Sequence, residues 1–166
     1  MTVTHHAKAG ILSDQNAAKR EEIVQLLTQA YWMEIETVTN YLAQSSNLDG
    51  IRAADIAADL AADVDEELGH AKQFAARIKE LYGTVPGSAD FPSDTDTGLQ
   101  PNGDATDVAS VIRGVIDAES GAIEHYSRII EVTDGVDWAT QDMVIAILRD
   151  EEGHMRTYER YLREFA

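Results

Sequence analysis

The sequence predicts an all-α protein, a bundle of four long helices with a long crossover between the second and the third. Apolar residues recur at steps of three and four along four segments, as in amphipathic helices. Two of these segments carry a Glu-x-x-His pair at mid-length, and the other two carry a lone glutamate there. A Pro- and Gly-rich stretch over residues 84–105 separates the first two segments from the last two.

The first helix is expected over residues 14–45, after candidate N-caps at Ser13 and Asp14. Its inward stripe consists of Ile23, Leu27, Ala30, Glu34, Val38 and Tyr41. Glu34 is the one charged member of this stripe. Glu36 lies about 200° further round the helix and is expected to point elsewhere. Residues 1–13 are expected to form a flexible arm.

The second helix is expected over residues 51–82, with Gly83 as the C′ residue that ends it. Its stripe consists of Ile56, Leu60, Val64, Glu67, Ala71, Phe74, Ile78 and Leu81. One glutamate, Glu67, again interrupts an apolar row, and His70 lies one turn further on the same face.

The crossover, residues 84–105, contains all three prolines and shows no helical period. It is long for a connection in a compact domain. Fully extended it spans up to ~70 Å, whereas a helix of ~30 residues is ~45 Å long. The crossover can therefore run the length of the bundle, so that the third helix starts at the far end. The alternative is a disordered insertion in an up-down-up-down bundle.

The third and fourth helices are expected over residues 107–132 and 138–165, with Asp137 as an N-cap of the fourth. Glu119 interrupts the apolar stripe of the third helix, and Glu151 with His154 that of the fourth. The neighbouring pair Glu124-His125 lies off the Glu119 stripe and is expected on the surface.

The two halves of the chain repeat one unit, a lone glutamate followed by a Glu-x-x-His pair. The lone glutamate precedes the pair by 33 residues in the first half and by 32 in the second. Six groups are thereby expected to converge at mid-bundle: Glu34, Glu67, His70, Glu119, Glu151 and His154. Burying four uncompensated carboxylates would cost several kcal/mol each. Two divalent cations would balance them, and this donor set favours iron, manganese or cobalt over zinc.

These residues resemble the ferritin-like di-iron superfamily, whose helical bundles hold two metals with this ligand set. The resemblance is closest to bacterioferritin and to Dps-like ferritins with a bacterioferritin-type ferroxidase centre. The motifs that carry it are Glu34 with Asn40-Tyr41, Glu67-x-x-His70, Glu119 with Tyr126, and Arg149-Asp150-Glu151-Glu152-Gly153-His154. Rubrerythrins carry a further glutamate where this chain has Ala122, which argues against that variant.

The resemblance implies a ferroxidase that oxidises Fe(II) with O2 or H2O2 at two iron sites per subunit, with manganese as an alternative metal. The six converging residues would be the ligands, and the ferric product would be stored as mineral in a hollow homo-oligomer. Tyr41 and Tyr126 would hydrogen-bond ligand carboxylates, or else simply pack in the core. Glu66 and Asp150 would each accept a ring N–H from a ligand histidine, or else be solvated helix charges.

Two departures from bacterioferritin refine this expectation. Leu68 stands where bacterioferritin carries its haem-ligating methionine, so haem binding is doubtful. The chain shows no segment for the short fifth helix of 24-subunit cages, so a dodecamer is favoured. Two other functions stay open: a redox protein that consumes peroxide or O2 without storing mineral, and a Dps-type protective shell.

The composition narrows the classes of partner. A net charge of −17 repels phosphate backbones, so direct DNA binding is disfavoured. The acidity fits either the solvated surface of a protein from a high-salt cytoplasm or patches that gather cations. Without cysteine there is no thiolate site. No signal-like N-terminus and no apolar run long enough for a membrane span is apparent, so a cytoplasmic protein is expected.

Overall fold

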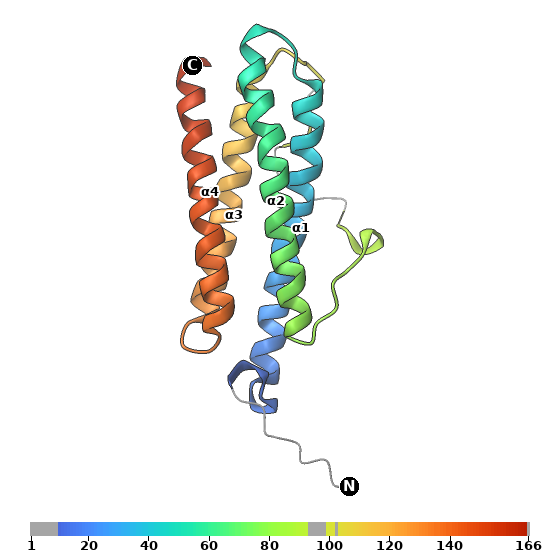
Figure 1. Ribbon diagram of the computed structural model, residues 1–166, viewed down its shortest axis with the longest axis vertical. Helices are drawn as coiled ribbons and strands as arrows, with labels where there is room; N and C mark the ends of the chain where they lie inside the picture. The colour runs from blue at the N-terminus through green and yellow to red at the C-terminus, as the bar shows by residue number, and fades with distance from the viewer. Residues whose placement is uncertain (1–9, 93–98, 102, 166) are drawn as a thin grey trace.

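The computed structural model describes residues 10–92, 99–101 and 103–165. Four helices form the bundle (Figure 1): α1 Ala17–Asn47, α2 Ala54–Glu80, α3 Val108–Thr133 and α4 Trp138–Phe165. Short 3-10 turns occupy Gly10–Leu12, Asp14–Asn16, Ile51–Ala53 and Ser88–Asp90. The described part of the chain contains no strand, which confirms the predicted all-α class. None of its helices combines the length and the apolar character that crossing a bilayer requires.

The crossover runs from one end of the bundle to the other, so that α2 and α3 are parallel (Figure 1). At one end, the Asp49 N–H in the α1–α2 turn donates to the Ala105 carbonyl at the end of the crossover, at 2.8 Å. At the other end, Arg77 near the end of α2 binds Asp137 in the α3–α4 turn. The predicted long crossover is therefore confirmed, and the up-down-up-down alternative is wrong.

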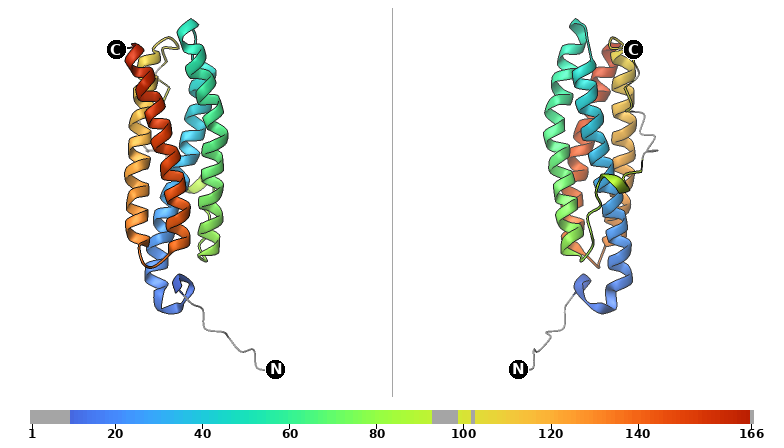
Figure 2. Two further views of the ribbon diagram at one scale, coloured as in Figure 1. Left: turned by 60° about the vertical axis from the view of Figure 1, so that its left-hand side comes forward. Right: turned by 90° about the vertical axis from the view of Figure 1, so that its right-hand side faces the viewer.

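The crossover lies along α1 (Figure 2), and side chains of that helix contact it. The Phe91 ring meets the Trp32 ring edge to face, with 4.6 Å between their centroids. Further along, the Gln44 side-chain amide donates to the Leu99 carbonyl at 3.1 Å, and Leu99 is buried. These contacts fix the path of the crossover over α1 on both sides of residues 93–98, which lie outside the described residues.

Helix α1 begins a few residues later than expected, and the segment before it is partly ordered. Residues 1–9 of the expected arm lie outside the described residues. Ile11, however, is buried in the core, so the expected boundary at residue 13 is too late. The Arg20 guanidinium donates to the carbonyls of Ile11 and Ser13, at 2.9 and 3.0 Å. The 3-10 turn at Gly10–Leu12 is thus tied to the first turn of α1.

The end of α2 differs by one residue from the prediction. Tyr82, not Gly83, adopts the left-handed conformation, with φ of 66°. The N–H of Gly83 donates to the Ile78 carbonyl at 2.8 Å, and that of Tyr82 to the Lys79 carbonyl at 3.1 Å. These two bonds form a Schellman motif in which Gly83 is the C″ residue. Glycine is needed there for space, because an added Cβ would lie 2.8 Å from side-chain carbons of Ile78 and Val24.

Replacing Gly83 by alanine is expected to destabilise the protein by about 1–3 kcal/mol, the usual cost of forcing one extra carbon into a packed core. Thermal unfolding measures the effect. Gly87→Ala is the matched control, because nothing lies within 4 Å of a Cβ added there and its φ of −97° suits any residue. Equal melting temperatures for the two variants would contradict the packing argument.

The apolar core forms two clusters, one toward each end of the bundle. The first includes Ala30, Phe74, Tyr126 and Ile147. The second includes Tyr41, Leu60, Val115 and Tyr158. On each helix, the predicted glutamate lies between the residues that belong to the two clusters: Glu34 on α1, Glu67 on α2, Glu119 on α3 and Glu151 on α4. A layer of charged groups therefore divides the core.

Candidate metal centre

The six residues predicted to converge lie together in this layer. Glu34, Glu67, Glu119, Glu151 and His70 are each at most 3% exposed, and the side chain of His154 is 12% exposed. Each helix contributes where its apolar stripe is interrupted, so the burial follows from the helical period. The structure thus places four carboxylates and two imidazoles inside the bundle.

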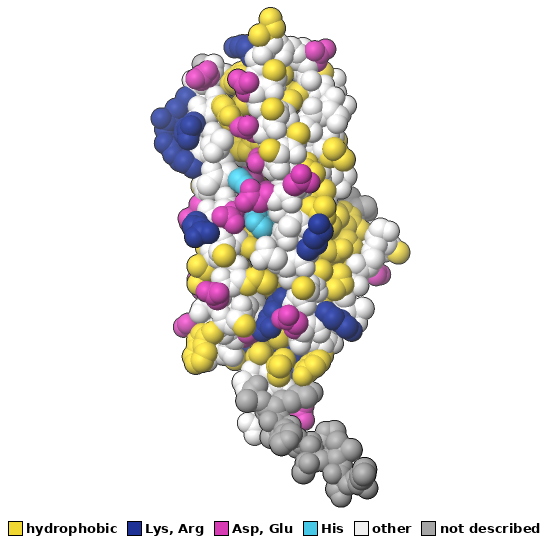
Figure 3. Space-filling model, in the orientation of Figure 1, with side chains coloured by type: hydrophobic (Ala, Val, Ile, Leu, Met, Phe, Trp, Pro, Cys, Tyr) yellow, Lys and Arg dark blue, Asp and Glu magenta, His cyan; other side chains and the backbone are white. Residues whose placement is uncertain are grey.

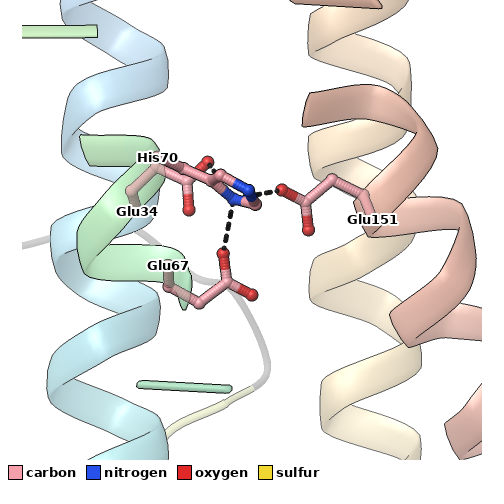
Figure 4. A group of neighbouring side chains, drawn as sticks. All are labelled: Glu34, Glu67, His70 and Glu151. Carbon is pink, nitrogen blue, oxygen red and sulfur yellow. Dashed lines mark hydrogen bonds and ion pairs between the residues drawn. The ribbon is translucent and has the colours of Figure 1, made fainter. Parts of the chain in front are cut away.

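The first group of potential ligands surrounds His70 (Figure 4). Its Nδ1 atom lies 3.2 Å from Glu67 Oε2, 3.1 Å from Glu151 Oε1 and 3.8 Å from Glu34 Oε1. One donor atom from each of these four residues lies within 4.8 Å of the other three. Three helices therefore present nitrogen and oxygen to one point.

The second group surrounds His154 and mirrors the first. Its Nδ1 atom lies 3.2 Å from Glu67 Oε1, 3.4 Å from Glu151 Oε2 and 3.9 Å from Glu119 Oε1. Glu67 and Glu151 thus belong to both groups and turn a different oxygen to each histidine. Each of them therefore faces both histidines, while Glu34 faces His70 and Glu119 faces His154.

Two buried tyrosines hold the unshared glutamates. The Tyr41 hydroxyl donates to Glu119, and the Tyr126 hydroxyl donates to Glu34. Each tyrosine thus binds the glutamate of the other half of the repeat. It lies seven residues, about two helical turns, after the glutamate of its own half and on the same inward face. Burial, followed by the neighbouring carboxylates, raises the pKa of both hydroxyls, so they remain donors at neutral pH.

The outer nitrogens of the histidines face carboxylates at the α2–α4 surface. His154 Nε2 lies 3.4 Å from Glu66 Oε2, and His70 Nε2 lies 3.7 Å from Asp150 Oδ2. Figure 3 shows the histidines among acidic side chains on this face. A carboxylate at Nε2 favours the tautomer whose Nδ1 lone pair points into the centre.

Sequence reasoning missed one residue of this surface, Asp63. Its Oδ2 atom accepts a hydrogen bond from the Tyr158 hydroxyl at 2.8 Å, and its carboxylate lies in a group with Glu66 and His154. The signal was present in the sequence, because Asp63 lies four residues before Glu67 on the same side of α2.

Of two other expectations, the one for His125 is wrong and the one for Glu36, that it points away from the centre, is confirmed. The expected surface position of His125 is wrong: the residue is 8% exposed, and its Nε2 atom lies 2.9 Å from the Leu26 carbonyl oxygen. It lines a groove between α1 and α3, whereas its neighbour Glu124 is exposed. Glu36 belongs to neither ligand group, yet it is only 5% exposed and so offers no neutral control for mutagenesis.

Proton affinities in the centre are strongly shifted. Burial, together with the charges of Glu67 and Glu151, raises the pKa of Glu34 and Glu119. Burial opposes ionisation of Glu67, but the two histidines beside its oxygens outweigh it and lower its pKa to about 2. Burial alone would lower the histidine pKa values, but Glu151 and Glu67 raise that of His70 to about 10 and that of His154 to about 12. Without a cation, protons balance the carboxylates.

Several donor atoms of the centre have no hydrogen-bond partner that would compensate for their burial, and a bound cation would supply one. Glu67 Oε1, Glu151 Oε1 and His154 Nδ1 are buried without a hydrogen-bond partner among the described residues. Leaving such an atom unsatisfied costs about 1–3 kcal/mol. All three atoms belong to residues of the two groups, and mixed carboxylate and imidazole donors suit iron or manganese.

Sequence comparisons agree with this geometry. Residues 24–166 match the family described as ferritin-like domain. The chain is 28% identical over 142 residues to a bacterioferritin from Desulfovibrio desulfuricans, covering 85% of this chain and 74% of that protein. It is 27% identical over 146 residues to a DNA protection during starvation protein from Pyrococcus furiosus, covering 86% and 77%.

Solved structures give the same result. The D. desulfuricans bacterioferritin, whose structure describes a diiron site, matches with a TM-score of 0.72 at 26% identity, over 89% of this chain and 81% of that one. A dodecameric thioferritin, the bacterioferritin-related protein from Bacteroides fragilis, matches with a TM-score of 0.78 at 26% identity, over 88% and 87%. The chain belongs to the ferritin-like family, near bacterioferritin and the Dps proteins.

Proposed function

We propose that this protein is a ferroxidase that stores or detoxifies iron. The observation that carries the proposal is the pair of buried donor groups that share Glu67 and Glu151. One iron ion would be held by Glu34 and His70, the other by Glu119 and His154, with the shared glutamates between them. Relatedness to a bacterioferritin with a diiron site supports the same role.

In this function each bound Fe(II) gives up one electron to O2 or H2O2; one H2O2, for example, takes up two electrons and two protons to give two waters. The residues of the chain prepare the site for this change. Their carboxylates favour the higher charge of Fe(III). Tyr41 and Tyr126 orient the unshared glutamates, and Glu66 and Asp150 orient the histidines. The core clusters on either side limit the access of water.

We further propose that the protein assembles as a homo-dodecamer in which the ferric product accumulates. The dodecameric relative from B. fragilis supports this number of subunits. Leu68 follows the second-helix glutamate and offers no thioether, so no haem site is proposed. Direct DNA contact is not part of the proposal, because the net charge of −17 opposes it.

Aerobic oxidation of Fe(II), followed by size-exclusion chromatography with iron analysis, tests the function. A fast absorbance rise should saturate at two Fe(II) per subunit, and iron added later should elute with an assembly of dodecamer mass. Fast oxidation by a dimer that retains only the two irons per subunit would favour a redox protein without mineral storage. An oxidation rate equal to that of buffer would overturn the ferroxidase assignment.

Cation binding is expected to release protons and to weaken as the pH falls. The raised pKa values of Glu34, Glu119, His70 and His154 mean that the metal-free centre holds protons that a cation must displace. Affinity therefore rises with pH up to the histidine pKa values of about 10 and 12. Adding Mn(II) to weakly buffered protein at pH 7 without oxygen should acidify the solution. Binding without acidification would contradict this charge balance.

A further inference from the structure

A small cavity adjoins the centre on the side of α1 and α3. Its volume is about 20 Å³. The carboxylates of the centre form its inner wall. Its outer wall consists of Met33 and Thr37 from α1 and of Ala118 and Ala122 from α3, all of them half-buried. The centre can therefore be approached from this side without passing the histidines, which do not line the cavity.

The two approaches to the centre differ in chemistry. On the α2–α4 face, His70 and His154 lie beside Asp150 and Glu66, which add negative charge. Histidine and acidic side chains gather on this face (Figure 3). On the α1–α3 face, the outer wall consists of the Met33 thioether, the methyl groups of Ala118 and Ala122, and the Thr37 side chain, none of them charged. A wall without charged groups offers an ion little to replace its water, so this side favours uncharged molecules over ions. An uncharged molecule loses far less hydration free energy than an ion when it enters such a space.

The size of the cavity sets a second limit. A cavity needs a volume of roughly 10–15 Å³, measured in the same way, to hold one water molecule. This cavity therefore accepts only a molecule about as small as water. The space exists because Ala118 and Ala122 lie one helical turn apart, on either side of Glu119, and neither side chain extends beyond Cβ. A larger side chain at either position would fill it.

We propose that this cavity is the pocket through which the small uncharged oxidant, O2 or H2O2, reaches the centre, and that Ala118 and Ala122 set its size. The inference rests on the proposed ferroxidase function and adds to it the side from which the oxidant enters. It assigns no role in cation entry to the α1–α3 face.

The test narrows the cavity stepwise with Ala122→Val and Ala122→Leu, and independently with Ala118→Val. Nitric oxide serves as an uncharged diatomic probe of the Fe(II)-loaded protein without oxygen, followed by stopped-flow absorbance. Its binding rate should fall in the order Ala, Val, Leu, by about tenfold or more for Leu, which corresponds to about 1.4 kcal/mol of barrier. Met33→Ala widens the entrance and should leave the rate unchanged or raise it.

Two measurements separate access from damage to the site. Anaerobic titration with Co(II) should give unchanged stoichiometry and affinity in all these variants, since none removes a donor. Ala109→Leu is the matched control: this alanine is also half-buried on α3 but does not line the cavity, so nitric oxide binding should keep its rate.

Oxidation by O2 and, without oxygen, by H2O2 completes the test. Slowing of either reaction in parallel with nitric oxide binding supports the proposal and identifies the oxidant that uses the pocket. Unchanged nitric oxide binding in Ala122→Leu and Ala118→Val, with Co(II) binding intact, would overturn it while leaving the ferroxidase function standing. Absence of Co(II) binding and of Fe(II) oxidation in the unmodified protein would instead overturn the function itself.

Discussion

Replacing Glu67 by alanine is expected to remove the fast phase of Fe(II) oxidation. Glu67 is the only second-helix carboxylate in both donor groups, and its two oxygens face different histidines at 3.2 Å each. Loss of residues that merely orient metal ligands costs about 10–100-fold in activity or metal affinity, so loss of a shared ligand should cost about 100-fold or more. The initial rate at two Fe(II) per subunit measures the effect.

Glu152→Ala is the matched control, since this glutamate is exposed on α4 beside Glu151 and belongs to neither group. Circular dichroism of the metal-free proteins should show the same helix content. Glu34→Ala and Glu119→Ala should also slow the fast phase severely, although each removes a ligand from only one group. If Glu67→Ala oxidises Fe(II) at the initial rate of the unmodified protein, Glu67 does not belong to the centre.

The largest loss of stability is expected from Arg77→Ala. The Arg77 guanidinium donates to Asp137 Oδ1 and to Thr140 Oγ1, both at 2.8 Å, and the Asp137 side chain is only 2% exposed. Removing one partner of a buried pair leaves an uncompensated charge and costs about 3–5 kcal/mol. For a chain of this size, a loss of about 3 kcal/mol lowers the melting temperature by roughly 6–12 °C.

Two comparisons isolate the buried charge as the cause. Arg156→Ala breaks an exposed pair with Glu159 and should cost no more than about 1 kcal/mol. Adding Asp137→Asn to Arg77→Ala should recover part of the loss, because the amide oxygen can still accept the Thr140 N–H that Asp137 now accepts at 3.2 Å. Equal melting temperatures for Arg77→Ala and Arg156→Ala would show that the buried pair contributes little.

Periodicity was sufficient to predict the helices and the inward direction of the charged residues. A single glutamate in an apolar stripe can only be buried, and four such interruptions at mid-length must meet when the helices pack side by side. The path of the crossover could be predicted because residues 84–105, when extended, span more than the length of one helix. These inferences worked because each depends on one repeating geometric rule.

Features that depend on contacts between distant residues were not predictable in this way. The left-handed residue at the end of α2 is Tyr82, because Gly83 is needed where the chain passes close to Ile78 and Val24. His125 is buried because its ring reaches the Leu26 carbonyl across the α1–α3 groove. The spacing of residues within one helix contains neither piece of information.

The division of the core by a charged layer also determines where the metal-free protein opens. Long helices ordinarily lose their amide protection from the ends inward. Here the two apolar clusters hold the helices together toward both ends of the bundle. When a chelator removes bound cations, the middle of the bundle keeps four buried carboxylates close to one another. Amide hydrogens around Glu34, Glu67, Glu119 and Glu151 should therefore exchange faster in the metal-free protein than in the metal-loaded protein. The metal-free bundle would then open first at mid-length.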